Sequence, residues 1–105
     1  MATTRDYLAF VMEQLPAEAA SRAMMGEYVL YYRGRVFGGL YDNRLLVKPI
    51  PAALALLSQA QQELPYDGAK PMLLVENMED RDFLAQLLEA MYPQLPEPKK
   101  KKSNA

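Results

Sequence analysis

The feature that most constrains the fold is a strand-like stretch, residues 24–48, that contains two turn signals at hairpin spacing. Tyrosine, valine, leucine and phenylalanine are dense in this stretch, as is typical of β-strands. The dipeptides Arg33-Gly34 and Asp42-Asn43 are suited to tight turns and divide the stretch into three segments. We therefore predict three antiparallel strands, at residues 27–32, 35–41 and 44–48.

The first of these strands is apolar on both of its faces. Because successive side chains of a strand point to opposite sides, Tyr28, Leu30 and Tyr32 share one face of the sheet. Val29 and Tyr31 share the other face. Helices can cover one of these faces, and the apolar side chains on the other face must be covered by something else.

Three further segments have the apolar spacing of amphipathic helices. In the first, Tyr7, Leu8, Val11, Met12 and Leu15 form one stripe, which Pro16 ends, and Thr3 and Asp6 have the spacing of a capping box. The second helix begins at Pro51 and runs to about residue 62. The third spans residues 79–92, with Asn77 as its cap, acidic residues in its first turn and Pro93 at its end.

The remaining segments complete the predicted order of elements. Residues 72–75 are a short apolar run suited to a buried strand, and residues 17–21 are a connector. The order α-β-β-β-α-β-α lacks the alternation of a doubly wound sheet and favours an α+β fold, a two-layer α/β sandwich with a mainly antiparallel sheet. We expect a single domain over residues 1–96 and a disordered, Lys-rich tail over residues 97–105.

The chain contains neither cysteine nor histidine, which restricts the chemistry available to it. Disulfides, thiolate nucleophiles, Ser-His-Asp triads and the usual zinc sites are excluded. We expect no catalytic residue, metal or cofactor and predict a non-catalytic protein. The enzymatic alternatives are Mg²⁺ held by carboxylates, or catalysis by a lysine outside the tail; the residues concerned are Glu76, Glu79, Asp80, Asp82, Lys48 and Lys70.

Charge is unevenly distributed along the chain. Residues 1–95 contain eight basic and twelve acidic side chains, and a basic run, Lys99 to Lys102, follows. An acidic body disfavours a broad nucleic-acid surface. No apolar run is long enough to span a bilayer and the first residues are polar, so we expect the protein in the cytoplasm.

The stretch MMGEYVLYYRGRVFGGLYDNRLLVKP, residues 24–49, resembles the TfoX N-terminal domain family, which is named for the Sxy-type regulators of natural transformation competence. The features that carry the resemblance are Met25-Gly26 followed by Tyr28 and Tyr31, the Gly-containing hairpin, Phe37-Gly38-Gly39 and the basic-Leu-Leu-Val-Lys strand. The resemblance extends over residues 4–92. It implies a role in competence or transcription regulation and a stand-alone copy of a domain that larger regulators join to a second, helical domain.

We predict that the sheet presents an interaction surface to a protein partner, with a second copy of the chain as one such partner. Gly38 and Gly39 interrupt a strand, which indicates either a bare backbone patch for a partner or a bulge or close crossing within the fold. Nucleic acid is the alternative partner, bound by the hairpin tyrosines, by Arg33, Arg35 and Arg44, and by the lysine tail. The candidate surface comprises Met25, Gly26, Tyr28, Tyr31, Arg33, Arg35, Phe37, Gly38, Gly39 and Tyr41.

Overall fold

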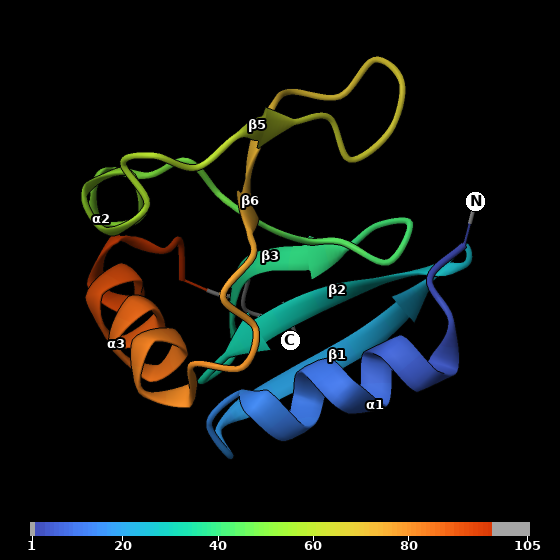
Figure 1. Ribbon diagram of the computed structural model, residues 1–105, viewed down its shortest axis with the longest axis horizontal. Helices are drawn as coiled ribbons and strands as arrows, with labels where there is room; N and C mark the ends of the chain where they lie inside the picture. Colours follow the sequence, from blue (N-terminus) through green and yellow to red (C-terminus); the bar gives the residue numbers. More distant parts are fainter. Residues whose placement is uncertain (1, 98–105) are drawn as a thin grey trace, which may run out of the picture.

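A computed structural model describes residues 2–97 and contains one antiparallel sheet with helices on one side (Figure 1). The strands follow the order β1-β2-β3-β4-β6-β5 across the sheet, and every neighbouring pair is antiparallel. The elements are α1 (Arg5–Gln14), β1 (Ala19–Met24), β2 (Glu27–Tyr32), β3 (Arg35–Leu40), β4 (Leu45–Val47), α2 (Pro51–Leu56), β5 (Gln62–Glu63), β6 (Met72–Val75), α3 (Arg81–Met91) and the 3₁₀ helix η1 (Tyr92–Gln94). The fold is α+β, as the sequence predicts.

A single hydrophobic core lies between the sheet and the helices. In Figure 1, α1 runs along β1 and β2, and α3 lies beside α2 at the other end of the sheet. All three helices contribute to the same core, so they cover the same face of the sheet. The buried members are Val11 from α1, Ala53 from α2, Leu84, Leu87, Leu88 and Met91 from α3, Leu30, Tyr32, Phe37, Leu40, Leu45, Val47, Leu73 and Val75 from the strands, and Leu15, Met78 and Leu95 from segments beside the helices.

Strand β1 was not predicted, and its first three residues, 19–21, fall in the predicted connector over residues 17–21. Five of its six residues are exposed, so they lack the apolar alternation that marks a half-buried strand. Backbone pairing with β2 and the tight turn at Met25-Gly26 define it instead. Both turn residues have positive φ, +52° and +86°, which is the backbone of a hairpin turn that continues the twist of its strands.

The second helix is shorter than its apolar spacing predicts, because α2 ends at Leu56 and not near residue 62. Gln62 and Glu63 instead pair with Leu73 and Met72 as strand β5. The prediction of a helix over residues 57–62 was therefore wrong: the chain turns after α2, with the Ala60 amide donating to the Leu57 carbonyl at 2.9 Å, before it reaches β5.

Two helix caps differ from the residues that the sequence pattern named. The hydroxyl of Thr4, not Thr3, accepts the Tyr7 amide at the start of α1, at 3.1 Å. Asp80, not Asn77, caps α3 by accepting the Phe83 amide at 3.0 Å. Thr3 is buried and bonds elsewhere: its hydroxyl donates to Glu27 Oε1 at 2.7 Å and accepts the Asn43 amide at 3.1 Å. These bonds fasten the amino-terminal segment to the sheet.

Gly38 and Gly39 lie where the backbones of β2, β3 and β4 approach closely. The pairing of β2 with β3 shifts register between Leu30 and Tyr31, which is a β-bulge. A Cβ added at Gly38 would lie 2.1 Å from the carbonyl oxygen of Leu46, and one at Gly39 would lie 2.7 Å from that of Tyr28. The two glycines therefore serve strand packing, which was the structural alternative to a bare backbone patch.

No helix within residues 2–97 is both long enough and apolar enough to cross a membrane.

We predict that Gly38→Ala destabilises the protein by about 3 kcal/mol, because the clash involves β4 backbone and cannot be relieved by a side-chain rotation. Urea unfolding measures the difference. The matched control is Gly68→Ala, where an added Cβ meets nothing within 4 Å and only the positive φ of +85° is penalised, by about 1 kcal/mol. Equal losses in the two variants would contradict the proposed close approach of β3 and β4.

Candidate interaction surface

The face of the sheet that points away from the helices, here called the outer face, is apolar and incompletely covered. In β2, Tyr28, Leu30 and Tyr32 pack in or against the core, whereas Val29 and Tyr31 alternate with them and lie outside it. Val36 lies opposite Tyr31 on β3 and is also half-buried outside the core. As predicted, β2 thus carries apolar side chains on both faces of the sheet.

Two adjoining hollows, of about 460 and 530 Å³, lie on the outer face and share Val36 and Lys48. The first extends past Val29 and Tyr41 to Met72 and the loop that joins β5 to β6. The second extends past Tyr31 to Arg22 on strand β1 and to Pro96 beyond η1. Together they form a groove that crosses the sheet from β1 to the β5–β6 loop.

The β5–β6 loop, residues 64–71, covers only one end of the outer face. Its Tyr66 ring lies 6.3 Å from the ring of Tyr41, centroid to centroid, yet Tyr66 is 63% exposed. The Tyr41 ring lies against Gly39, in the space that a side chain on β3 would fill. Burial raises the pKa of Tyr41, and the neighbouring Tyr66 and Glu27 add to the rise. A neutral phenol therefore stays at this end of the groove at physiological pH.

Exposed methionines extend the apolar surface to the tip of the β1–β2 hairpin. Met24 is 47% exposed and Met25 is 98% exposed. Both line a hollow of about 490 Å³ with Glu27, Tyr41 and Tyr66, which adjoins the groove through the two tyrosines. Met side chains adapt to varied partner shapes, so this tip suits a contact surface.

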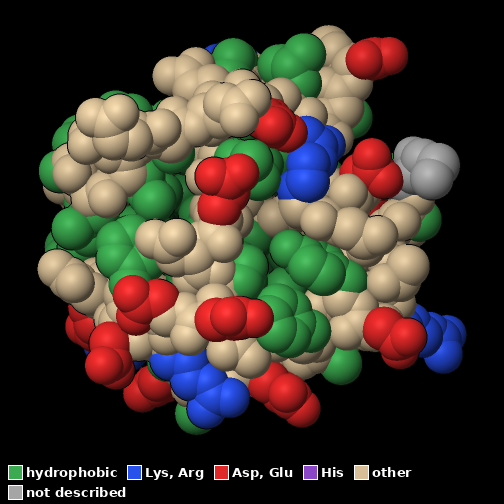
Figure 2. Space-filling view, in the orientation of Figure 1, with side chains coloured by type: hydrophobic (Ala, Val, Ile, Leu, Met, Phe, Trp, Pro, Cys, Tyr) green, Lys and Arg blue, Asp and Glu red, His purple; other side chains and the backbone are tan. Residues whose placement is uncertain are grey.

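The charges beside the groove are mainly basic. Arg22, Lys48 and Lys70 line it, with Glu97 as its one acidic lining residue. Within residues 2–97, none of those three basic side chains forms an ion pair. Figure 2 shows the opposite character on the face that carries α1 and α3, where acidic side chains are widespread and basic ones are few.

The ten residues of the predicted surface do not lie on one face. Met25, Gly26, Tyr31 and Tyr41 lie at the hairpin tip or on the outer face. Phe37 is a core residue with 1% exposure, and Tyr28 packs against the core. Gly38 and Gly39 are buried between strands, although Gly38 also lines the groove. Arg33 and Arg35 lie at the opposite end of the β2–β3 hairpin.

Arg33 is engaged within the protein. Its Nη2 lies 2.9 Å from Glu89 Oε2 and 4.0 Å from Glu18, and its guanidinium lies 5.1 Å from the centroid of the Tyr32 ring. The buried hydroxyl of Tyr32 donates to the same Glu89 carboxylate. This cluster links the β2–β3 turn to α3.

Arg35 holds the segment that follows α3. Its guanidinium stacks 4.4 Å from the centroid of the Tyr92 ring and donates to the carbonyl oxygens of Tyr92 and Leu95 at 3.2 and 3.3 Å. Only 19% of its side chain is exposed. Arg44 is likewise paired, with Glu63 at 2.6 Å. The three arginines expected to bind a partner therefore fasten elements of the fold together.

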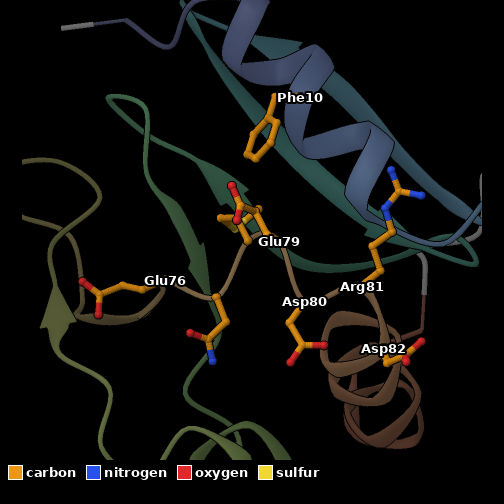
Figure 3. A pocket seen from close by; sticks show the side chains of 8 residues that line it. Phe10, Glu76, Glu79, Asp80, Arg81 and Asp82 are labelled. Atoms are coloured by element: carbon orange, nitrogen blue, oxygen red, sulfur yellow. The ribbon is translucent and has the colours of Figure 1, made fainter.

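A polar hollow of about 850 Å³ lies at the start of α3 and contains the acidic residues considered for Mg²⁺ (Figure 3). Asp80 is occupied as the helix cap, and Arg81 donates to Gln14 of α1 at 3.2 Å. Phe10 points into the hollow from α1, as Figure 3 shows. Among residues 2–97, no three acidic side chains come together as a metal-binding group.

The ten-residue surface predicted from the sequence leaves out Arg22, Val29, Val36, Lys48 and Met72, although they line the groove. The alternation in β2 had already placed Val29 on the same face as Tyr31. Met72 lies on β6 and Lys48 directly follows β4, and their positions depend on the strand order β3-β4-β6. The lysines of the tail, Lys99 to Lys102, lie outside the described residues.

One comparison with known proteins decides the family. An uncharacterized 12.7 kDa protein from the trpE 5′ region of Spirochaeta aurantia is 36% identical to this chain over 106 residues, which span 98% of this chain and 92% of the spirochaete protein. The chain belongs to the family of that protein. No family model matches the chain. No solved structure matches it either.

Membership in this family extends over every element of the fold, because the alignment spans nearly the whole of both chains. The spirochaete relative is itself uncharacterized and supplies no activity. The function therefore has to be inferred from the surface of this chain.

The Tyr32–Glu89 contact predicts a loss of stability at alkaline pH. Burial, and then the hydrogen bond to Glu89, raise the pKa of Tyr32 to about 12 from an ordinary value of 10.0. The folded state therefore favours the neutral phenol, and this contribution is complete below pH 10 and lost as the pH rises towards 12. We expect the free energy of unfolding to fall by about 2 kcal/mol more in the natural protein than in Tyr32→Phe over this range.

Urea titrations of both proteins between pH 8 and pH 12 measure this difference, since the other tyrosines titrate in both and cancel. A difference between the two proteins that stays constant with pH would show that Tyr32 is not held in its neutral form by the fold.

Proposed function

We propose that the protein is a non-catalytic regulatory domain that binds a protein segment in the groove of its outer face and acts in the cytoplasm. The observation that carries the proposal is that all three helices cover one face of a sheet that is apolar on both. Val29, Tyr31 and Val36 are left half-buried on the other face. Covering apolar surface is favourable, and a partner can supply the cover that this chain lacks.

The groove indicates the chemistry of the partner segment. Its floor is aliphatic and aromatic, and Arg22, Lys48 and Lys70 stand at its sides without ion pairs among the described residues. A segment with apolar side chains flanked by Asp or Glu would satisfy both features. The complementary charges would hasten association and set its direction along the groove.

The resemblance to the TfoX N-terminal domain supports a regulatory role over a metabolic one. The stretch that carries the resemblance, residues 24–49, supplies Val29, Tyr31 and Val36 to the outer face. A regulator of this type acts by contact, and the absence of cysteine and histidine from the chain is consistent with contact rather than catalysis. Competence or transcription is the process that the resemblance suggests.

Nucleic-acid binding is the alternative function. Arg33, Arg35 and Arg44, on which it was to depend, pair with groups of the chain itself. It therefore rests on Arg22, Lys48 and Tyr31 in the groove, together with the lysine tail. Titration of a fluorescent single-stranded oligonucleotide at low salt separates the two functions, because binding to phosphate weakens steeply as salt is added.

The outer-face proposal predicts where a photoreactive residue will cross-link. Placed at Tyr31 in the groove, it should form a discrete adduct with a partner in the cells that produce the protein. Placed at Leu54, which is 42% exposed on α2 and outside the groove, it should not.

The recovered partner is then titrated by calorimetry against substituted proteins. We expect Val36→Asp to raise Kd at least tenfold, about 1.4 kcal/mol, because it places an unpaired charge on the apolar floor. Leu54→Asp is the matched control and should leave Kd unchanged. Adducts of equal yield at Tyr31 and Leu54, or equal Kd values for the two Asp variants, would remove the outer face as the binding site.

A further inference from the structure

Strand β1 forms a long, open edge of the sheet. It is six residues long and pairs on one side with β2, and no other segment of residues 2–97 pairs with its second side. Strands at a sheet edge present unpaired amide and carbonyl groups that can pair with another chain. The opposite edge, β5, has only two residues and is followed closely by Pro65, so it offers little backbone for pairing.

The hydrogen bonds around β1 show which of its backbone groups point outward. The Glu18 carbonyl accepts the Arg33 amide of the β2–β3 turn at 3.2 Å, and Met24 and Glu27 face each other across the two-residue hairpin turn. Because antiparallel strands alternate, the even-numbered residues bond to β2 and the odd-numbered ones face outward. Ala19 already donates to the Pro16 carbonyl at 2.9 Å, which leaves the amides of Ser21 and Ala23 for a new strand.

The edge also lacks the usual protection against pairing. Proteins guard exposed edges with charged side chains, prolines or bulges, and β1, with the sequence AASRAM, has neither a proline nor a bulge and has one charged residue. Its single charged residue is Arg22, whose side chain lies on the outer face beside Tyr31 in the groove. The residues that carry the outward amides, Ser21 and Ala23, have small side chains, so another backbone can approach closely.

We propose that β1 pairs with β1 of a second copy in an antiparallel arrangement centred on Ser21, which joins two six-stranded sheets into one. Ser21 of each copy then exchanges both backbone hydrogen bonds with Ser21 of the other. The Ala23 amide meets the Ala19 carbonyl of the second copy. A two-fold axis makes such an interface self-complementary, because each copy supplies the same groups in reverse order.

Charge selects this register over its nearest alternative. The two sheets can keep their outer faces on one side only if paired residues share a face, so the centre falls on a residue of β1. Centring on Ala20 would pair only residues 19–21 of the two strands with each other, so the nearest alternative to Ser21 is Arg22. Centring on Arg22 would place two arginines directly opposite each other, which is destabilising. Centring on Ser21 places Arg22 of one copy opposite Ala20 of the second copy. The diagonal neighbours of this Arg22 are then the exposed Glu18 and the Arg22 of the second copy.

The paired sheet would join the outer faces of the two copies. The groove reaches β1 through Arg22 and Tyr31, so the grooves of the two copies would meet at the two-fold axis. This inference depends on the backbone of β1 and not on the apolar floor of the groove. It can therefore stand if the outer-face proposal fails, and it can fail while that proposal stands.

Sedimentation of the full chain over a range of concentrations tests the pairing. The natural protein should form a dimer, and Ser21→Pro should weaken it at least tenfold, because proline removes an outward amide and leaves the bonds to β2 intact. Ser21→Ala keeps the amide and is the control, which should dimerise like the natural protein. Hydrogen exchange should show the Ser21 and Ala23 amides gaining protection as the dimer forms.

Substitutions at Ala20 test the register. Ala20→Glu would face Arg22 of the second copy and should tighten the dimer, whereas Ala20→Arg should loosen it. A strict monomer, a dimer indifferent to Ser21→Pro, or equal effects of the two Ala20 variants would overturn the proposal. So would a chain that remains monomeric and pairs β1 only with a peptide of another protein.

Discussion

The structure depends on how one layer of helices meets a sheet that is apolar on both faces. Leu30, Phe37 and Val47 point towards the helices and complete a core to which α1, α2 and α3 all contribute. Val29, Tyr31 and Val36 lie on the other side of the same strands and receive no helix. Because all the helices of the described residues pack on the inner face of the sheet, they bury the core there and leave the groove on the outer face exposed.

Within the sheet, two glycines allow the backbones of three strands to pack closely and a tyrosine to lie flat. Gly38 lets β3 and β4 approach, and Gly39 leaves room for the Tyr41 ring at one end of the groove. At the far end of β3, Arg35 stacks on Tyr92 and holds the chain after α3 beside the sheet. The arginines of the hairpins thus act within the fold, and the basic residues beside the groove come from β1, from the residue after β4 and from the β5–β6 loop.

Much of this fold can be predicted from local pattern. Strand β2 and strand β6 occupy the predicted residues, because dense apolar and β-branched residues mark them. Strand β1 could not be predicted in this way, because backbone hydrogen bonds to β2 define it and five of its six residues are exposed. The groove was predicted only in part: alternation in β2 indicates Tyr31, but Lys48 and Met72 join it through a strand order that no local pattern encodes.

The five valines of the chain are natural reporters of the central claim, because Val29 and Val36 lie on the outer face and Val11, Val47 and Val75 lie in the core. Methyl chemical shifts recorded while the partner is added test that claim most directly. Binding in the groove predicts that the signals of Val29 and Val36 move and that those of the three core valines stay in place. Shifts confined to the core valines, or absent from Val29 and Val36 at saturation, would contradict a partner on the outer face.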